Sequence, residues 1–258
     1  MNLLLLEPGE LSSEGLARLT GDRARHVREV LRASAGQHLR VGVVGGAAWT
    51  ATVVELDATS VSLACALEAA PPRPLVHLLL ALPRPKVLRR LWPQLAALGV
   101  ARIVLTNAER VERNYFDTHL LAPAEYRPLL IEGLQQARDT HLPEVSVHRQ
   151  FRVLIEDHLD PLLGDAVRLV AHPEAAQRVH EALAPAPSGR TVALAVGPEG
   201  GWNRFELSLL ERHGFMRVDM GARTLRSDTA CIALLALVHD ALRGAHDAAT
   251  HERGVTGG

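Results

Sequence analysis

The spacing of hydrophobic and polar positions changes near residue 70 of the chain. In the first part, residues 39–43, 49–56 and 60–67 alternate apolar residues with small or polar ones. Alternation with a period of two is typical of β-strands that bury one face. Short turns that contain glycine or aspartate separate these runs. The pattern predicts a small antiparallel β-barrel near the N-terminus, which on pattern alone serves equally well as a structural cap.

Beyond this part, strands and helices alternate at longer spacing. The proline-rich segment 71–74 is a stiff linker, and we expect it to separate a domain of residues 1–72 from a domain of residues 73–258. The apolar runs predict buried strands at 76–82, 102–106, 167–171 and 192–196, and helices at 87–98 and 126–138. The fold class predicted for this C-terminal domain is α/β with a parallel sheet.

A glycine-rich loop follows the apolar run 192–196. The loop reads Gly197, Pro198, Glu199, Gly200, Gly201 and Trp202. Its glycines allow positive φ and let a ligand approach the backbone closely. Asn203 and Glu206 are spaced as a capping box, which predicts that a helix begins at Arg204.

The same order of elements recurs further along the chain. Residues 215–220 are expected to form a short strand, Gly221 breaks it, and Ser227 is placed to cap an apolar helix from Asp228 to about Leu242. Two such loops predict a site for a neutral or zwitterionic nucleotide-like ligand at the carboxyl edge of the sheet. The alternative is that each loop only connects a strand to a helix. The sequence contains neither a Walker loop nor a dinucleotide-binding fingerprint.

Composition narrows the class of protein. Of 258 residues, 47% are hydrophobic and 22% are charged, as in a globular protein. No apolar run reaches the roughly 18 residues that a membrane helix needs, and the N-terminus lacks the basic region of a secretory signal. The 13 histidines are scattered, and Cys65 and Cys231 lie apart in apolar surroundings. We therefore expect no metal site, no disulfide, no membrane contact and a cytoplasmic location.

The net charge of −1 gives no general attraction to RNA, so an RNA-binding protein of this charge must concentrate its cations locally. Arg25, Arg28 and Arg32 have the spacing of one helix face in a short helix expected within residues 21–31. Such a stripe contacts phosphates, or it is a solvated helix face. Lys86 is the only lysine among the 28 basic residues, and the others are arginines. Such uniform use of arginine reflects the composition of the genome more than RNA binding.

The two loops together closely resemble a known family, RsmE. The residues that carry the resemblance are Gly-Pro-Glu-Gly-Gly-Trp at 197–202, Gly-x-Arg-x-Leu-Arg-x-Asp-Thr-Ala at 221–230, His-x-x-x-Val-Leu-Arg at 26–32, and landmarks at Lys86, 98–100, Gln136 and 142–144. The match covers nearly the whole chain.

RsmE proteins are ribosomal RNA methyltransferases of the knotted SPOUT superfamily, and they use S-adenosylmethionine. The resemblance implies methylation of N3 of a uridine in small-subunit ribosomal RNA. It also implies a PUA-like, RNA-docking N-terminal domain, a C-terminal trefoil knot, and a homodimer with the active site at the subunit interface. With this resemblance, Arg25, Arg28, Arg32 and Lys86 become the expected RNA-binding residues.

The resemblance also implies which residues bind the cofactor. They are His172, Val196, Gly197, Pro198, Glu199, Gly200, Gly201, Met220, Gly221, Leu225, Arg226, Thr229 and Ala230. Backbone groups would bond the edge of the adenine, and apolar side chains would cover its faces. His172 has the alternative role of simply ending a strand.

Methyl transfer to uracil N3 removes the N3 proton and spreads negative charge over two carbonyl oxygens. Cationic donors aimed at those oxygens stabilise the charge, and we expect Arg226, with Arg223, to supply them. Asp228 or Glu199 would accept the proton or hold an arginine in place. The alternative for Arg226 is a salt bridge to one of these carboxylates. The family usually has glutamate at position 228, so the shorter Asp228 favours a capping or orienting role.

Two other functions are open from the sequence. The same fold methylates other RNA positions, such as a ribose 2′-hydroxyl. A non-catalytic RNA-binding protein of ribosome assembly would keep the pocket only for stability.

Overall fold

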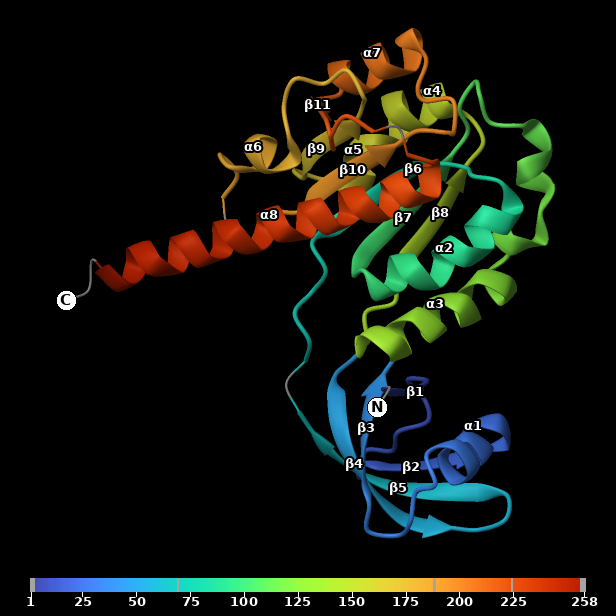
Figure 1. Cartoon of the computed structure of the whole chain (residues 1–258). Helices are drawn as coiled ribbons and strands as arrows, with labels where there is room; N and C mark the ends of the chain where they lie inside the picture. The colour runs from blue at the N-terminus through green and yellow to red at the C-terminus, as the bar shows by residue number, and fades with distance from the viewer. Residues whose placement is uncertain (1–2, 69, 188, 224, 256–258) are drawn as a thin grey trace. The chain divides into compact units, whose positions relative to one another are not determined.

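The computed structural model describes residues 3–68, 70–187, 189–223 and 225–255, with side chains up to residue 244 (Figure 1). The chain divides into two compact units, one of Met1–Arg73 and Leu130–Leu142, the other of Pro74–Leu129 and Pro143–Gly258. Helix α3 (Pro123–Ala137) contributes residues to both units. Residues 130–142, which come after the proline linker in the sequence, therefore belong to the same unit as the N-terminal residues.

The first unit contains a curled sheet that is mainly antiparallel (Figure 1). Within the described residues its strand order is β1 (Leu4–Leu6), β3 (His38–Val43), β4 (Ala48–Leu56), β5 (Ser60–Leu67) and β2 (Leu16–Thr20). Strand β1 pairs with β3 in parallel, whereas the other pairs are antiparallel. The three central strands confirm the alternation in the sequence. The outer strands β1 and β2 were not predicted. Strand β1 has only three residues, and in β2 the apolar Leu16 lies on the exposed face, which hides the alternation in the sequence.

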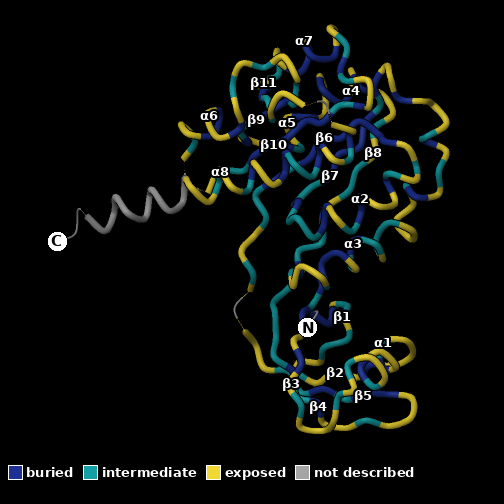
Figure 2. The backbone as a smooth tube through the Cα atoms, viewed as in Figure 1, coloured by how far each residue is buried: buried dark blue, intermediate teal, exposed yellow. Residues whose placement is uncertain are grey.

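Alternate positions of these strands form the core of the first unit. Val41, Ala51 and Val61 are fully buried, and Ala24 and Val27 pack onto the same cluster from the segment that follows β2. That segment is α1 (Gly21–Arg25), continued by a π-helical turn (His26–Val30). The tube in Figure 2 shows the resulting change between buried and exposed positions along the strands.

The second unit is built on a parallel sheet. Among the residues described, its strand order is β11 (Met216–Val218), β9 (Val167–Ala171), β10 (Val192–Val196), β6 (Val76–Ala81), β7 (Val100–Thr106) and β8 (Glu144–His148). All five pairings are parallel. Every residue of β10 is buried, as expected for an apolar strand inside a parallel sheet. The coarse prediction of a mixed α/β protein with a parallel sheet is confirmed.

Helices flank this sheet (Figure 1). They are α2 (Pro85–Ala97), the first part of α3, α4 (Phe151–Val153), α5 (Leu159–Leu163), α6 (Val179–Leu183), α7 (Arg204–Arg212) and α8 (Ser227–Val255), with a π-helical turn at Leu154–His158 and 3₁₀ turns at Arg113–Asp117 and His119–Leu121. The short helices α4, α5 and α6 and strand β8 were not predicted.

Helix α8 differs from its expected limits at both ends. The carbonyl of Arg226 accepts the N–H of Ala230 at 2.8 Å, so Arg226 holds the N-cap position. Ser227, which was expected to be the cap, instead lies in the first turn and is buried. The helix also continues to Val255, beyond Leu242.

Candidate functional site

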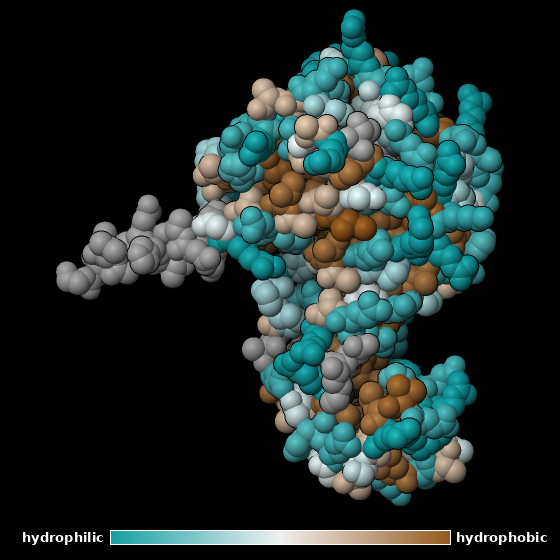
Figure 3. All heavy atoms as spheres, in the orientation of Figure 1, coloured by the Kyte–Doolittle hydropathy of each residue, from teal (hydrophilic) through white to brown (hydrophobic). Residues whose placement is uncertain are grey.

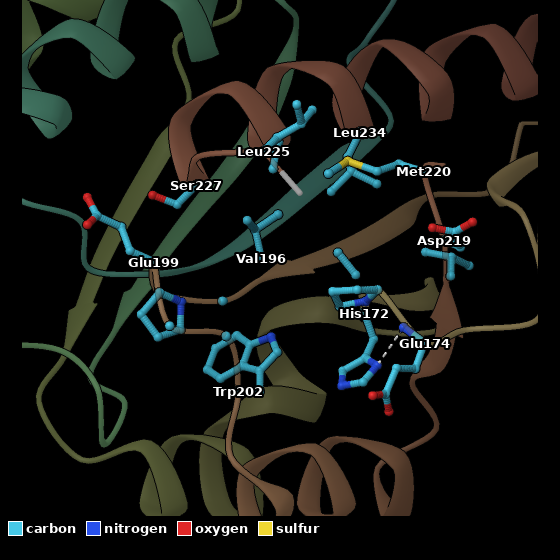
Figure 4. A pocket seen from close by; sticks show the side chains of 18 of the residues that line it. His172, Glu174, Val196, Glu199, Trp202, Asp219, Met220, Leu225, Ser227 and Leu234 are labelled. Atoms are coloured by element: carbon cyan, nitrogen blue, oxygen red, sulfur yellow. Dashed lines mark hydrogen bonds between the residues drawn. The ribbon is translucent and has the colours of Figure 1, made fainter. Parts of the chain in front are cut away.

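A cavity of about 340 Å³ opens at the carboxyl edge of the parallel sheet (Figure 4). Strands β9, β10 and β11 end there, and the segments that follow them form the walls together with the first turns of α8. The lining residues are Arg110, Ala171, His172, Pro173, Glu174, Val196, Gly197, Pro198, Glu199, Gly200, Gly201, Trp202, Val218, Asp219, Met220, Gly221, Arg223, Leu225, Ser227, Ala230 and Leu234. The two glycine-bearing loops therefore meet at one site, as the sequence predicted.

The side chain of Trp202 packs against the backbone of the first loop at Gly197. A Cβ atom at Gly197 would lie 3.1 Å from Trp202 Nε1 and 3.2 Å from both Cδ1 and the backbone nitrogen of Trp202. The indole is buried and packs against the ring of Phe151, with centroids 5.4 Å apart and the ring planes tilted by 35°. Gly201 has φ of 73° and donates its N–H to the carbonyl of Pro198 at 2.8 Å. Gly197 therefore permits close packing against the indole, and Gly201 permits a left-handed backbone.

Helix α7 begins directly after this loop. The side chain of Asn203 accepts the N–H of Glu206 at 2.7 Å, and Glu206 Oε2 accepts the N–H of Asn203 at 2.9 Å. This confirms the predicted capping box and the helix start at Arg204. Glu206 is buried, and its Oε1 accepts the N–H of Glu109 at 2.7 Å, which ties the segment after β7 to the loop. A guanidinium N–H of Arg110 donates to the carbonyl of Gly200.

The second loop turns sharply after β11. Asp219 Oδ1 accepts the N–H of Gly221 at 2.9 Å, and Gly221 has φ of 120°, which only glycine adopts readily. Met220 and Leu225 extend from this loop toward the cavity (Figure 4). Ser227, Ala230 and Leu234 add one side of α8 to the lining, because their spacing of three and four residues is that of one helix face.

His172 follows β9 and lines the cavity between the two loops (Figure 4). Its backbone N–H donates to the carbonyl of Val218 at 3.0 Å. Its Nδ1 accepts the N–H of Glu174 at 3.2 Å, which assigns the proton of the neutral ring to Nε2. The imidazole therefore offers a hydrogen-bond donor to a bound molecule, and it also ends the strand.

Two arginines at the start of α2 pair with carboxylates near the cavity, one in the first loop and one in the first turn of α8. Arg84 lies 3.3 Å from Glu199, and Arg90 lies 3.1 Å from Asp228. These pairs replace the salt bridge that was the alternative role of Arg226. The side chain of Arg226 is exposed and has no ion-pair partner among the described residues. Asp228 Oδ1 also accepts the N–H of Thr229 at 2.9 Å.

Most of the expected cofactor-binding residues line the cavity. These are His172, Val196, Gly197, Pro198, Glu199, Gly200, Gly201, Met220, Gly221, Leu225 and Ala230. Arg223, an expected catalytic residue, also lines it. Arg226, Asp228 and Thr229 belong to the same segment but are not part of the lining.

Several lining residues were missed from the sequence. They are Arg110, Ala171, Pro173, Glu174, Trp202, Val218, Asp219, Ser227 and Leu234. Pro173 and Glu174 come just after the predicted strand 167–171, and Asp219 lies near the end of the predicted strand 215–220, so the rule that ligands bind at carboxyl strand ends was sufficient to find them. Arg110 comes four residues after the end of β7, too far along the segment for this rule to single it out, and a hydrogen bond to Gly200 holds it beside the cavity.

The arginines expected to bind RNA in the first unit do not form a continuous helical stripe. Arg25 pairs with Asp22 at 2.8 Å, and Arg28 donates to the carbonyl of Asp57 at 3.3 Å. The backbone of Arg32 is left-handed, with φ of 49°, so it lies beyond the end of the helical turns. Lys86 lies in the second unit, in the first turn of α2, and is exposed.

Both cysteines are free thiols. The described residues contain no group of three or more His, Cys, Asp or Glu side chains that could hold a metal ion. Burial raises the pKa of Cys231 to about 12, and it also raises the pKa of Cys65. In the part of the chain that the structure describes, no helix has the length and apolarity needed to cross a bilayer.

The chain is similar in sequence to known methyltransferases. The sequence model of a family described as RNA methyltransferase domain matches residues 71–239. A ribosomal RNA small subunit methyltransferase E of Treponema pallidum is 33% identical over 243 residues, which cover 92% of this chain and 90% of that protein. A protein of the same name from Synechocystis is 27% identical over 234 residues, which cover 88% of this chain and 73% of that protein.

Solved structures have the same fold. The ribosomal RNA small subunit methyltransferase E of Neisseria gonorrhoeae, bound to S-adenosyl methionine, has a TM-score of 0.73 at 22% identity over 92% of this chain and 95% of that one. A putative methyltransferase of Legionella pneumophila, in complex with the cofactor SAM, has a TM-score of 0.72 at 23% identity, over 93% of this chain and 97% of that one. The family match and the 33% identical relative together show that the chain belongs to the ribosomal RNA small subunit methyltransferase E (RsmE) family.

Proposed function

We propose that this chain binds S-adenosylmethionine in the cavity and transfers the methyl group to ribosomal RNA. The observation that carries the proposal is the meeting of both glycine loops and the start of α8 around one cavity of about 340 Å³. Small-molecule sites typically measure about 300–1,000 Å³. Relatives of the same fold are bound to this cofactor, and the 33% identical relative is a ribosomal RNA methyltransferase by name.

The lining fits a nucleoside-bearing cofactor. Gly197 and Gly221 line the cavity with backbone atoms alone, and backbone groups of this kind can bond the edge of an adenine. Val196, Met220 and Leu225 supply apolar contacts for the faces of a flat ring. The sulfonium of the bound cofactor supplies an electrophilic methyl group.

The target in this proposal is N3 of a uridine, in keeping with the family. Arg226 stabilises the negative charge that develops on the uracil oxygens, and Arg223, which lines the cavity, assists. Arg226 suits this role because the nearby carboxylates are engaged elsewhere, Glu199 by Arg84 and Asp228 by Arg90. With one oxygen on Arg90 and the other on a backbone N–H, Asp228 has an orienting role rather than that of a base.

The finer architecture is part of the same proposal. The first unit acts as a PUA-like domain that docks RNA, the α8 region forms the trefoil knot, and two chains assemble into a homodimer with the small ribosomal subunit as substrate. Support for the homodimer comes from α8, where Leu237 is 41% exposed. Figure 3 shows hydrophobic residues gathered on the viewed face of the second unit. The enzyme works in the cytoplasm in this proposal.

The experiment has two arms. Isothermal titration with S-adenosylmethionine measures cofactor binding, and mass mapping of small-subunit ribosomal RNA incubated with enzyme and cofactor locates the methyl group. Arg226→Ala is expected to keep the cofactor affinity and to lose roughly 100-fold or more in turnover. Arg212→Ala, an exposed arginine on α7, is the control and should remain fully active. No heat of binding together with no methyl transfer would support a non-catalytic protein, and methylation of a ribose would change the target.

A further inference from the structure

The segment at the start of α2 carries a cluster of cations on the solvent side. We call Arg84, Lys86, Arg89 and Arg90 the α2 basic face; all four side chains are exposed. The opposite side of the helix is buried in the second unit through Leu88, Leu91, Trp92, Leu95 and Ala96. The cations therefore project away from the core of this unit.

The placement of these charges does not serve the helix itself. Cations are stabilising near the C-terminus of a helix and unfavourable near its N-terminus, where the peptide dipoles leave partial positive charge. In α2, Lys86 stands in the first turn and Arg89 and Arg90 follow within the next, while the last turn has no basic residue. Residues 85–97 include no Asp or Glu that would offset the charge from within the helix.

Two members of the α2 basic face are tied to the loops of the cavity. Arg84 pairs with Glu199, which lines the cavity, and Arg90 pairs with Asp228, in the first turn of α8. The other two, Lys86 and Arg89, have no ion-pair or side-chain hydrogen-bond partner within the described residues. The face therefore borders the cavity and presents two unneutralised cations beside it.

We propose that the α2 basic face is a docking surface for the phosphate backbone of the RNA substrate, with Lys86 and Arg89 as the contacting side chains. The inference rests on the proposed function, because it assigns the RNA path at the same site. A strand that crosses this face is held by its phosphates while one of its bases enters the cavity. Phosphate contacts fix register and orientation without reading sequence, which suits a surface made only of cations.

The test is the salt dependence of RNA binding by Lys86→Ala with Arg89→Ala. Fluorescence anisotropy with a labelled fragment of small-subunit ribosomal RNA, over a series of salt concentrations, gives the slope of log Kd against log salt. Each lost phosphate contact lowers the slope by about one, so the double variant should lose about two and bind roughly tenfold more weakly. Alanine favours the helix, so circular dichroism and the affinity for S-adenosylmethionine should not change.

The matched control is Arg152→Ala with Arg212→Ala, on α4 and α7, which lie apart from α2 in Figure 1. It removes the same charge and should leave the slope nearly unchanged. The exchange Lys86→Arg with Arg89→Lys keeps both cations and should keep the wild-type slope. An unchanged slope in the alanine variant, or an equal loss in the control, would overturn this inference alone. Failure of the wild-type chain to bind both cofactor and RNA would overturn the proposed function instead.

Discussion

Replacing Gly197 by alanine tests how the first loop shapes the cavity. The added Cβ would meet three atoms of Trp202 at 3.1, 3.2 and 3.2 Å. Carbon contacts are optimal near 3.5–4.0 Å, so the new contacts are too short by about 0.4 Å. The indole cannot simply turn away, because it is buried and packs against the ring of Phe151. Overpacking of this kind costs about 1–3 kcal/mol.

The assay combines thermal unfolding with titration of S-adenosylmethionine. A loss of about 2 kcal/mol lowers Tm by roughly 4–8 °C for a protein of this size. If the loop relaxes by moving into the cavity, part of the same free energy appears as weaker binding, up to about 30-fold for 2 kcal/mol. Gly9→Ala is the control, because no atom lies within 4 Å of the added Cβ.

A second comparison separates rigid from flexible neighbours. A Cβ at Gly200 would lie 2.7 Å from Arg110 Cδ, a shorter contact than any at Gly197. Arg110 is exposed, so its side chain can move at small cost, and Gly200→Ala should destabilise less than Gly197→Ala. Wild-type Tm and cofactor affinity in Gly197→Ala would refute the view that the packed indole sets the shape of this loop.

Three further predictions address other parts of the chain. Glu206→Ala removes the buried acceptor of two backbone N–H groups, so urea unfolding should show a loss of about 2–3 kcal/mol, against under 1 kcal/mol for the exposed Glu211→Ala. Burial lowers the pKa of His77, so the contribution of its neutral ring to stability is present above about pH 6.5 and is lost as the pH falls through the pKa of the folded state. The variant His77→Gln should therefore lose less stability on acidification than the wild type. An equal loss in both proteins would exclude this histidine as the cause. Arg28→Ala with Arg32→Ala should flatten the salt dependence of RNA binding, whereas an unchanged slope would mark both as solvated side chains.

Local sequence signals predicted the elements with regular hydrogen bonding. The run 192–196 is a fully buried strand, and the pair Asn203 and Glu206 forms the capping box that starts α7. Both depend on residues within a few positions of each other, so a pattern in the sequence is enough to find them. The short strands β1 and β2 lack such a pattern, because pairing with distant strands holds them in place.

Side-chain partners were harder to predict than elements. The alternative role of Arg226 was a salt bridge to Asp228 or Glu199, but in the structure these carboxylates pair with other arginines, Glu199 with Arg84 and Asp228 with Arg90. The latter two residues are 138 positions apart. No local spacing reports such a contact, since it exists only after the sheet has brought α2 beside the loops.

By itself the sequence determined the class of fold, the two glycine loops, and the family, because these reside in short contiguous motifs and in periodic burial. The tertiary structure decided that Asp219 and Arg110 line the same cavity as the two loops, and that the α2 basic face lies at its edge. The physical reason is that parallel strands bring distant loops to one edge of the sheet, and only their order in the sheet decides which loops meet there.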